Sequence, residues 1–210
     1  MPDNITKILI ATTNPGKIAE LRTCLGHDIR LLGLKDLGEI PEIKEDGKTF
    51  AENARKKALG YAQESGCITI ADDSGLIIDA LGGAPGVNSA RFSGEKQKGS
   101  DRTLIDHRNI AKVLELLKDV PKEKRTARFV CCLCLASKEK VLLEAKGTLE
   151  GFIIEKEIGN KGFGYDPIFF VPALKKTVAQ LSPDEKNTIS HRGNAIRILK
   201  PQLERLLKRI

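Results

Sequence analysis

Residues 67–80 read Cys67-Ile68-Thr69-Ile70-Ala71-Asp72-Asp73-Ser74-Gly75-Leu76-Ile77-Ile78-Asp79-Ala80. The apolar run Cys67–Ala71 predicts a buried strand, Asp72–Gly75 a turn, and Leu76–Ala80 a second strand. Ligands collect at the ends of strands in α/β folds, so Asp72 and Asp73 are candidates for a metal site. The alternative is an Asx-type turn that binds no ligand. Two adjacent charges between apolar runs favour the metal site, because a tight turn would not need both.

A strand–loop–helix unit lies near the start of the chain. Lys7–Ala11 is short and apolar, as in a buried strand, and the polar loop Thr12–Lys17 precedes a helical pattern. Thr13 or Asn14 suits the N-cap of that helix, and N–H groups at a helix N-terminus attract phosphate. The Walker pattern GxxxxGK[ST] is absent, and capped turns are common in α/β proteins. Phosphate binding and an ordinary capped turn therefore both remain open.

The other segments predict a mixed sheet with helices. Expected helices cover 50–65, after the capping-box pattern Thr49–Glu52, then 101–118, a start at Ser182, and a last helix that kinks or restarts at Pro201. Expected strands cover 128–136, 141–148 and 151–157, and a short apolar run covers 168–171. Strands that alternate with helices and are followed by a run of strands indicate an α/β or α+β protein.

Length and cysteine usage limit the class of protein. A chain of 210 residues fits a single domain, residues 1–210, which a cleft can divide into two lobes. No apolar run approaches the roughly 18 residues of a membrane helix. The five cysteines have neither a disulfide framework nor a zinc spacing. We therefore expect a soluble cytoplasmic protein with reduced cysteines and no membrane partner.

The net charge of +7 favours an anionic partner, either a small polyphosphate or a nucleic acid. Solvated helix faces account for much of this charge. The aromatic residues are seven Phe and two Tyr, and they do not interleave with the basic runs. A stacking platform for bases along a nucleic-acid strand is therefore not indicated, and we expect no nucleic-acid partner.

A second acidic segment, Glu42–Asp46, precedes the helix expected at 50–65. Magnesium takes a few carboxylate oxygens and completes its shell with water and substrate phosphates. One carboxylate from this segment and one from Asp72–Gly75 would meet that need. A solvated acidic loop explains Glu42–Asp46 equally well.

Two further segments have side chains suited to a nucleotide. In Lys161–Pro167, glycines flank Phe163, so its ring can stack on a base, with Asp166 as a hydrogen-bond acceptor. The alternative is a glycine-rich turn whose Phe and Tyr pack into the core. Lys186 and Ser190–Gly193 begin helical patterns and could hold phosphate or read a purine edge, whereas a surface or capping histidine at 191 is the commoner case.

Together these segments resemble the inosine triphosphate pyrophosphatase family, enzymes that remove non-standard purine nucleoside triphosphates. The resemblance covers nearly the whole chain, in the order Ala11–Lys17, Gly47–Ala54, Ala71–Leu76, Leu81–Val87, Gly162–Phe169 and Ser190–Gly193. It implies hydrolysis of ITP, dITP or XTP to the monophosphate and pyrophosphate with Mg²⁺. It also implies a homodimer and an α/β fold with a long, twisted mixed sheet flanked by helices and a cleft between two lobes.

The resemblance also implies roles for matching residues. Phosphates would be held by Thr12, Thr13, Asn14, Pro15, Gly16 and Lys17. Ser74 would contact the substrate, and the nucleotide site would include Phe163, Gly164, Tyr165, Asp166, Lys186, His191 and Arg192. Metal would be bound by Asp73 and Glu45, although Glu42 or Asp46 could share the role of Glu45. Asn53 and Lys57 could reach the same site, and Asp72 is expected to support Asp73 or form the turn.

The expected catalytic residues are Asp73 and Lys17. Water attacks the α-phosphorus in line, Asp73 accepts or orients its proton, and Lys17 with Mg²⁺ neutralises the departing pyrophosphate. Arg192 is expected to meet the 6-oxo group of the purine, which adenine lacks.

Two other functions remain as alternatives. One is a Maf-like nucleotide pyrophosphatase with a different base preference. The other is a basic nucleic-acid-binding module, which the net charge alone favours.

Overall fold

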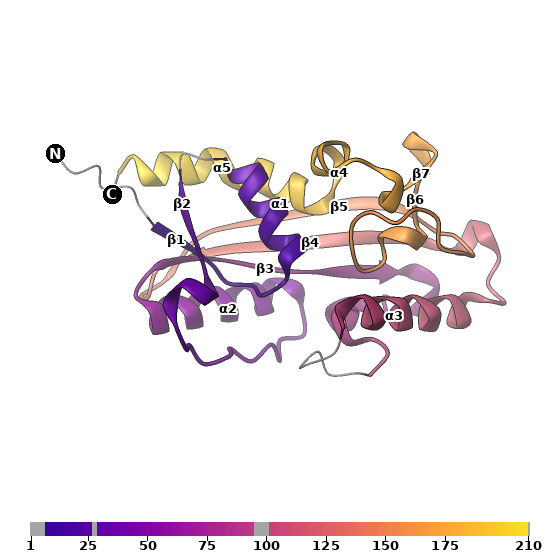
Figure 1. The fold of residues 1–210 in the computed structure, drawn as a ribbon, viewed down its shortest axis with the longest axis horizontal. Coiled ribbons are helices and arrows are strands. Elements are labelled where there is room, and N and C mark those ends of the chain that lie inside the picture. Colours follow the sequence, from indigo (N-terminus) through magenta and orange to yellow (C-terminus); the bar gives the residue numbers. More distant parts are fainter. Residues whose placement is uncertain (1–6, 27–28, 95–100, 210) are drawn as a thin grey trace. The chain divides into compact units, whose positions relative to one another are not determined.

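The computed structural model describes residues 7–26, 29–94 and 101–209. Within these residues the strands form one seven-stranded sheet in the order β2-β1-β3-β4-β5-β6-β7 (Figure 1). The strands are β1 Lys7–Ile10, β2 Arg30–Gly33, β3 Ile68–Ile78, β4 Thr126–Ala136, β5 Val141–Ile153, β6 Phe169–Val171 and β7 Lys176–Thr177. The α-helices are α1 Pro15–Leu25, α2 Phe50–Ser65, α3 Arg102–Leu117, α4 Pro183–Ile189 and α5 His191–Leu207.

The sheet is mixed. β1 is parallel to both of its neighbours, β2 and β3, whereas β6 is antiparallel to both β5 and β7. Parallel strands require crossover connections. α1 lies in the connection from β1 to β2, and α2 lies in the connection from β2 to β3. The predicted fold class, a mixed α/β sheet flanked by helices, is confirmed.

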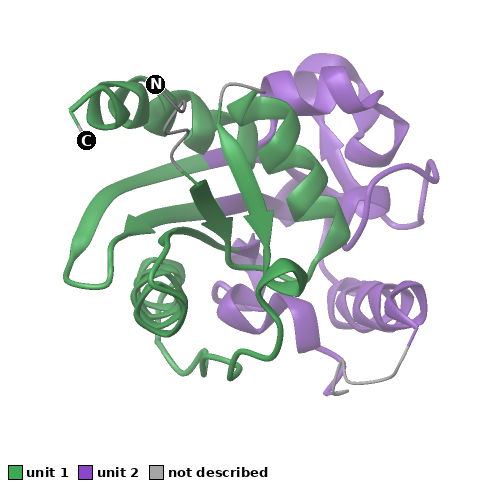
Figure 2. Cartoon of the chain, turned by 60° about the vertical axis from the view of Figure 1, so that its left-hand side comes forward, with its two compact units in different colours: residues 1–73, 131–147, 191–210 green, residues 74–130, 148–190 purple. Residues whose placement is uncertain are grey.

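The chain divides into two compact units (Figure 2). Unit 1 comprises residues 1–73, 131–147 and 191–210, and unit 2 comprises residues 74–130 and 148–190. The long strands β3, β4 and β5 contribute residues to both units. The prediction of a single domain with a cleft between two lobes stays a prediction.

Unit 1 is built on strand residues covered by helices on both faces. In Figure 1, α1 and α5 lie on one face and α2 on the other. α5 buries Ala195, Ile196, Leu199 and Leu203, whose spacing of three and four residues places them on one side of a helix. These side chains pack in a core with strand and α1 residues that include Ile8, Ile10, Leu21, Leu25, Ile70 and Leu133.

Unit 2 has its own core beneath α3. That helix buries Ile105, Ile110, Val113 and Leu117 at helical spacing. Its partners in the core include Leu76, Ile78, Phe129, Ile153, Tyr165, Ile168 and Phe169. The rings of Phe129 and Phe169 stack with centroids 4.4 Å apart.

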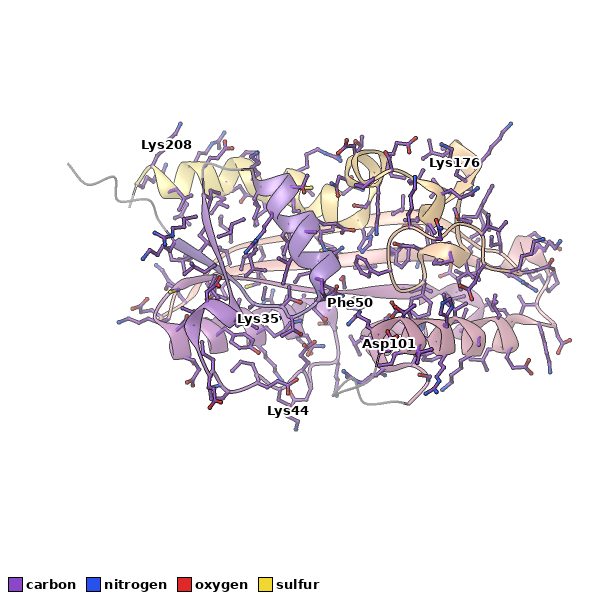
Figure 3. The ribbon with its side chains drawn as sticks, in the orientation of Figure 1. Lys35, Lys44, Phe50, Asp101, Lys176 and Lys208 are labelled. Carbon is purple, nitrogen blue, oxygen red and sulfur yellow. The ribbon has the colours of Figure 1, made fainter. Side chains whose placement is uncertain are left out.

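The helix caps follow the sequence closely. Asn14 caps α1, because its Oδ1 accepts from the N–H groups of Gly16 at 2.9 Å and Lys17 at 3.3 Å. Thr49 Oγ1 accepts from the Glu52 N–H at 3.2 Å and so caps α2, whose first residue, Phe50, is labelled in Figure 3. Asp101, also labelled there, caps α3.

The predicted turn at Asp72–Gly75 is wrong, because β3 runs without interruption from Ile68 to Ile78. Gly75 has no Cβ, which lets the Ser89 side chain pack close to the strand backbone, and it does not form a turn. A Cβ at this position would lie 2.3 Å from Ser89 Oγ, and that hydroxyl accepts from the Leu76 N–H at 2.9 Å. Asp72 and Asp73 therefore lie in the middle of a strand and not at its end.

The predicted division of residues 141–157 into two strands is also wrong. β5 is a single strand that ends at Ile153, and its last residues pair with β6, Phe152 with Phe170 and Ile153 with Phe169. Pairing with a distant strand extends β5 where the local sequence suggested a break. Similarly, α5 continues through Pro201 as one helix, so the predicted restart there is wrong.

Two expectations about the class of protein can be compared with the structure. All five cysteines are free thiols, as predicted, and Cys131, Cys132 and Cys134 are buried. Among the described residues, no helix is both long and apolar enough to span a membrane.

Candidate active site

Asp72 and Asp73 project from opposite faces of β3, since successive side chains of a strand alternate. Both are buried: Asp72 is 0% exposed and Asp73 is 6% exposed. On one side Asp72 meets side chains from α1 and α5, and on the other Asp73 meets side chains from α2. All of these elements belong to unit 1. The two carboxylates therefore contact different helices, although the charge of Lys17 lowers the pKa of both.

Asp72 is an internal anchor for two cations. Its Oδ1 lies 2.5 Å from Lys17 Nζ and its Oδ2 lies 2.7 Å from Arg192 Nε. The thiol of Cys131 also donates to Oδ2 at 3.1 Å. Burial by itself raises the pKa of the Asp72 carboxyl, but Arg192 and Lys17 outweigh that effect and hold the pKa well below its usual range. Asp72 is thus held as a carboxylate by these two cations, and the expectation that it supports Asp73 stays a prediction.

Arg192 is 1% exposed and is held between two carboxylates. Besides Asp72, it contacts Glu20 of α1 through its Nη1. The prediction that Arg192 reads the 6-oxo group of a purine stays a prediction. In this structure its guanidinium joins α5 to β3 and α1 inside unit 1.

Asp73 lies among polar groups of α2. Lys57 Nζ is 3.6 Å from Asp73 Oδ1, and Asn53 donates a side-chain hydrogen bond to the carboxylate. The other oxygen, Asp73 Oδ2, is buried without a hydrogen-bond partner among the described residues. Burial raises the pKa of the Asp73 carboxyl above its usual range, and Lys57 and Lys17 oppose that rise. A buried oxygen without a partner next to a raised pKa marks a functional position.

Glu45 approaches the same lysine. Its Oε2 lies 3.2 Å from Lys57 Nζ, and its charge raises the pKa of Asp73 further, so the two carboxylates face one cation. Asp46 turns away: it pairs with Lys44 at 3.2 Å and with Lys56. Between Glu45 and Asp46, the geometry favours Glu45 as the partner of Asp73.

The residues around Asp73 fit a magnesium ion. Asp73 offers an oxygen with no hydrogen-bond partner in the described part of the chain, and Glu45 offers a carboxylate whose side chain is 37% exposed. Among the described residues, no group of three or more His, Cys, Asp or Glu could hold a metal ion. The pair of carboxylates Asp73 and Glu45 is a donor set that Mg²⁺ can use, because this ion keeps several waters and substrate oxygens in its shell.

The loop before α1 is partly occupied by its own cap. The Asn14 side chain takes the N–H groups of Gly16 and Lys17, and Thr12 Oγ1 accepts from the Asn14 N–H at 3.2 Å. Thr13 and Pro15 are exposed, whereas Asn14 is 7% exposed. The capped-turn interpretation is therefore confirmed, and phosphate binding by this loop stays a prediction.

In unit 2, the predicted nucleotide loop gathers around Asp166. Its Oδ2 lies 2.6 Å from Lys186 Nζ and accepts from the Phe163 N–H at 3.0 Å. The Lys186 ammonium lies 4.4 Å from the centroid of the Phe163 ring. These contacts bring together Phe163, Asp166 and Lys186, and the binding of a base by this group stays a prediction.

The other predicted site residues are accounted for individually. Tyr165 is 4% exposed, belongs to the core of unit 2 and donates from its hydroxyl to the Ser89 carbonyl at 2.8 Å, so its ring packs as the core alternative held. Ser74 is a half-buried residue of β3 in unit 2. His191 is the 7% exposed first residue of α5 in unit 1.

Four residues with defined contacts were not found from the sequence: Glu20, Ser89, Asp106 and Cys131. Glu20 had a weak signal in the sequence, because a spacing of three residues places it on the same side of the helix as Lys17. In the structure both side chains form ion pairs within the group around Asp72. Ser89, Asp106 and Cys131 contact residues that are distant in the sequence, and no local sequence pattern predicts these contacts.

Comparison with known proteins gives consistent matches along nearly the whole chain. The sequence model of the Ham1 family matches residues 8–202. The dITP/XTP pyrophosphatase of Shouchella clausii (strain KSM-K16) is 48% identical, over 95% of this chain and 98% of the relative. The dITP/XTP pyrophosphatase of Geobacter sulfurreducens (strain ATCC 51573 / DSM 12127 / PCA) is 46% identical, over 95% and 97% of the two chains.

Solved structures agree with the sequence matches. The Staphylococcus aureus Ham1 protein has a TM-score of 0.82 and 41% identity, covering 95% of this chain and 98% of that chain. A HAM1 protein from Coxiella burnetii has a TM-score of 0.83 and 40% identity, covering 95% and 99%.

Proposed function

The chain belongs to the Ham1 family, and on that premise we propose that it hydrolyses non-standard purine nucleoside triphosphates, such as dITP, ITP and XTP, to the monophosphate and pyrophosphate. The relatives quoted above carry the name dITP/XTP pyrophosphatase. The observation that carries the proposal is the buried carboxylate of Asp73, which has one oxygen without a partner and faces Lys57 beside Glu45. Neither the Maf-like nor the nucleic-acid-binding alternative is favoured by these relatives.

Asp73 acts as the proton acceptor in this proposal. A water oxygen attacks the α-phosphorus, the bond from that phosphorus to the bridging oxygen breaks, and the water proton passes to Asp73. The raised pKa of Asp73 makes its carboxylate a better base than an ordinary exposed aspartate. Asn53 and Lys57 keep the carboxylate oriented, because each contacts it directly.

Asp73 and Glu45 would hold Mg²⁺. When bound, this ion would supply charge neutralisation for the polyphosphate and lower the pKa of the attacking water. Lys57 lies against both carboxylates, so their negative charge is partly compensated without the ion.

Lys17 has a supporting role. Its ammonium is paired with the buried Asp72 but its side chain remains 14% exposed, at the N-terminus of α1. There it can add positive charge for the departing pyrophosphate, together with the helix dipole.

The loop of unit 2 would bind the base. Phe163 offers a ring for stacking, and the Asp166–Lys186 pair presents an acceptor and a donor whose relative position is fixed at 2.6 Å. A hydrogen-bonding site discriminates between bases far better than an apolar pocket does. A homodimer and a cytoplasmic location complete the proposal: the homodimer rests on the family resemblance, and the location on the composition and cysteine usage of the sequence.

A substrate panel tests the proposal. Purified protein with Mg²⁺ is given ITP, dITP, XTP, ATP, GTP and a pyrimidine triphosphate, and the products are identified by phosphorus NMR. We expect pyrophosphate from ITP, dITP and XTP, with little turnover of the others. Orthophosphate as the first product, or an equal rate with every base, would contradict the proposal.

Asp73→Asn separates catalysis from folding. Loss of the proton acceptor is expected to lower kcat by about 10²- to 10⁴-fold, with no fall in melting temperature, because the buried charge is disfavoured at this position. Asp119→Asn is the matched control, since Asp119 is exposed and lies in the other unit. An Asp73→Asn variant that retains turnover would refute the assigned role.

A further inference from the structure

A carboxylate of α3 holds the backbone of the loop of residues 161–167. Gly164 donates its N–H to Asp106 Oδ2 at 2.8 Å, and both residues belong to unit 2. Asp106 lies 58 positions before Gly164, on the second turn of α3. A hydrogen bond from a backbone N–H to an ionised carboxylate is stronger than one between neutral groups.

A second attachment holds the next residue of the loop. The Tyr165 hydroxyl donates to the Ser89 carbonyl at 2.8 Å, and the Asn109 side chain donates to the same carbonyl at 3.4 Å. Asn109 lies three residues after Asp106 and so on the same side of α3. Its Oδ1 also accepts from the Ser93 N–H at 2.7 Å. One face of α3 thus holds Gly164 directly, through Asp106, and contacts through Asn109 the Ser89 carbonyl to which Tyr165 donates.

The Asp106 contact controls the peptide next to Phe163. The N–H of Gly164 belongs to the peptide that joins it to Phe163, and a peptide is planar. Fixing this N–H therefore fixes the plane from which the Phe163 ring departs. On the other side of Phe163, its own N–H is held by Asp166, the partner of Lys186.

The surroundings of Asp106 show that the contact is costly to maintain. Burial raises the pKa of the Asp106 carboxyl, and the Gly164 N–H, Arg102 and His107 only partly oppose that rise. A carboxylate that only formed a helix surface would remain in water. Here it is half-buried and accepts from the backbone of a loop in which Phe163, Asp166 and Lys186 contact one another.

We propose that Asp106 is a positioning residue for nucleotide binding: by holding the Gly164 N–H it orients Phe163 for stacking on the base. The proposal rests on the proposed function for the identity of the ligand, whereas the attachment itself does not. Loss of the attachment should weaken binding of the base and leave the chemistry at Asp73 unchanged. The expected signature is a change in KM with little change in kcat.

A pair of substitutions tests the attachment. Asp106→Ala removes the acceptor, whereas Asp106→Asn keeps a side-chain oxygen at the same place. Amide hydrogen exchange by NMR should show Gly164 exchanging about tenfold faster in Asp106→Ala than in wild type, and within about twofold of wild type in Asp106→Asn. Glu115→Ala, at an exposed position of the same helix, should leave Gly164 unchanged.

Kinetics with ITP test the consequence for the nucleotide. We expect KM to rise about tenfold in Asp106→Ala, with kcat within about twofold of wild type, and Asp106→Asn to restore KM. Unchanged Gly164 exchange in Asp106→Ala, or a fall in kcat at constant KM, would overturn the proposal. If Asp106→Ala does not fold, Asp106→Ser, whose hydroxyl is too short to reach Gly164, carries the same comparison.

The two proposals fail in different ways. If wild-type protein neither binds nor hydrolyses ITP, the proposed function fails and with it the nucleotide role of Asp106. The exchange comparison at Gly164 would still decide whether Asp106 holds the loop.

Discussion

Replacing Asp72 with asparagine removes the buried negative charge that Lys17 and Arg192 share. Asp72 is completely buried, and the two cations lie 2.5 Å and 2.7 Å from its oxygens. Removing one partner of a buried ion pair leaves an uncompensated charge and costs about 3–5 kcal/mol. Arg192 keeps its contact with Glu20, whereas Lys17 forms an ion pair with no second carboxylate among the described residues, so we expect a loss of free energy of unfolding within that range.

Urea denaturation followed by circular dichroism measures this loss. With a slope of about 2–3 kcal/mol per molar urea, the midpoint should fall by about 1–2.5 M. The matched control is Asp46→Asn. Asp46 also contacts two lysines, Lys44 and Lys56, but it is exposed. Asp46→Asn should therefore have the same urea midpoint as wild type within error.

A double substitution tests the cause of the effect. Asp72→Asn combined with Lys17→Met removes the unpaired charge together with its partner, so the double variant should be more stable than the sum of the two single losses implies. Two results would refute the assignment of Asp72 as the anchor of this group. One is a midpoint for Asp72→Asn equal to that of Asp46→Asn, and the other is strict additivity with Lys17→Met.

Two further predictions concern packing and titration. Gly147→Ala places a Cβ 2.2 Å from the His191 carbonyl oxygen, a backbone atom that cannot move aside, so we expect a destabilisation of about 3 kcal/mol in the same urea assay. The control is Gly33→Ala, whose added Cβ would have its nearest neighbour at 3.6 Å and should change the midpoint little. Equal urea midpoints for the two variants would contradict the close packing at Gly147. Burial raises the pKa of Asp106 in the folded protein, so ionisation of this carboxyl at neutral pH destabilises the fold. The stability that the protonated carboxyl contributes is fully present below the unfolded pKa of about 3.9. It is lost as the pH rises through the higher pKa of the folded protein. Asp106→Asn should therefore melt above wild type at pH 7, and this difference should shrink towards zero as the pH is lowered to about 4; a difference that grows in acid would show that the pKa is lowered instead.

Much of the fold could be predicted from local sequence. The caps at Asn14, Thr49, Asp101 and Ser182 and the apolar spacing of α5 each depend on residues within a turn or two of one another. Such short-range patterns are legible in a single sequence because near neighbours decide them.

The errors occurred where a distant segment overrides the local pattern. Asp72–Gly75 has the composition of a turn, yet the Ser89 side chain packs against Gly75 and β3 continues through it. β5 is likewise extended by pairing with β6. Neither partner is visible in the local sequence.

The sequence by itself determined the family, the α/β class and the identity of Asp73 as the residue on which the chemistry is proposed to depend. Tertiary structure alone decided which groups surround each member of the acidic pair. Asp72 is held by Arg192, 120 positions away, while Asp73 turns to α2 and keeps one buried oxygen without a partner among the described residues. The physical reason is that a strand sends adjacent side chains to opposite faces, and only the packing of helices on those faces determines which carboxylate is neutralised and which stays available for chemistry.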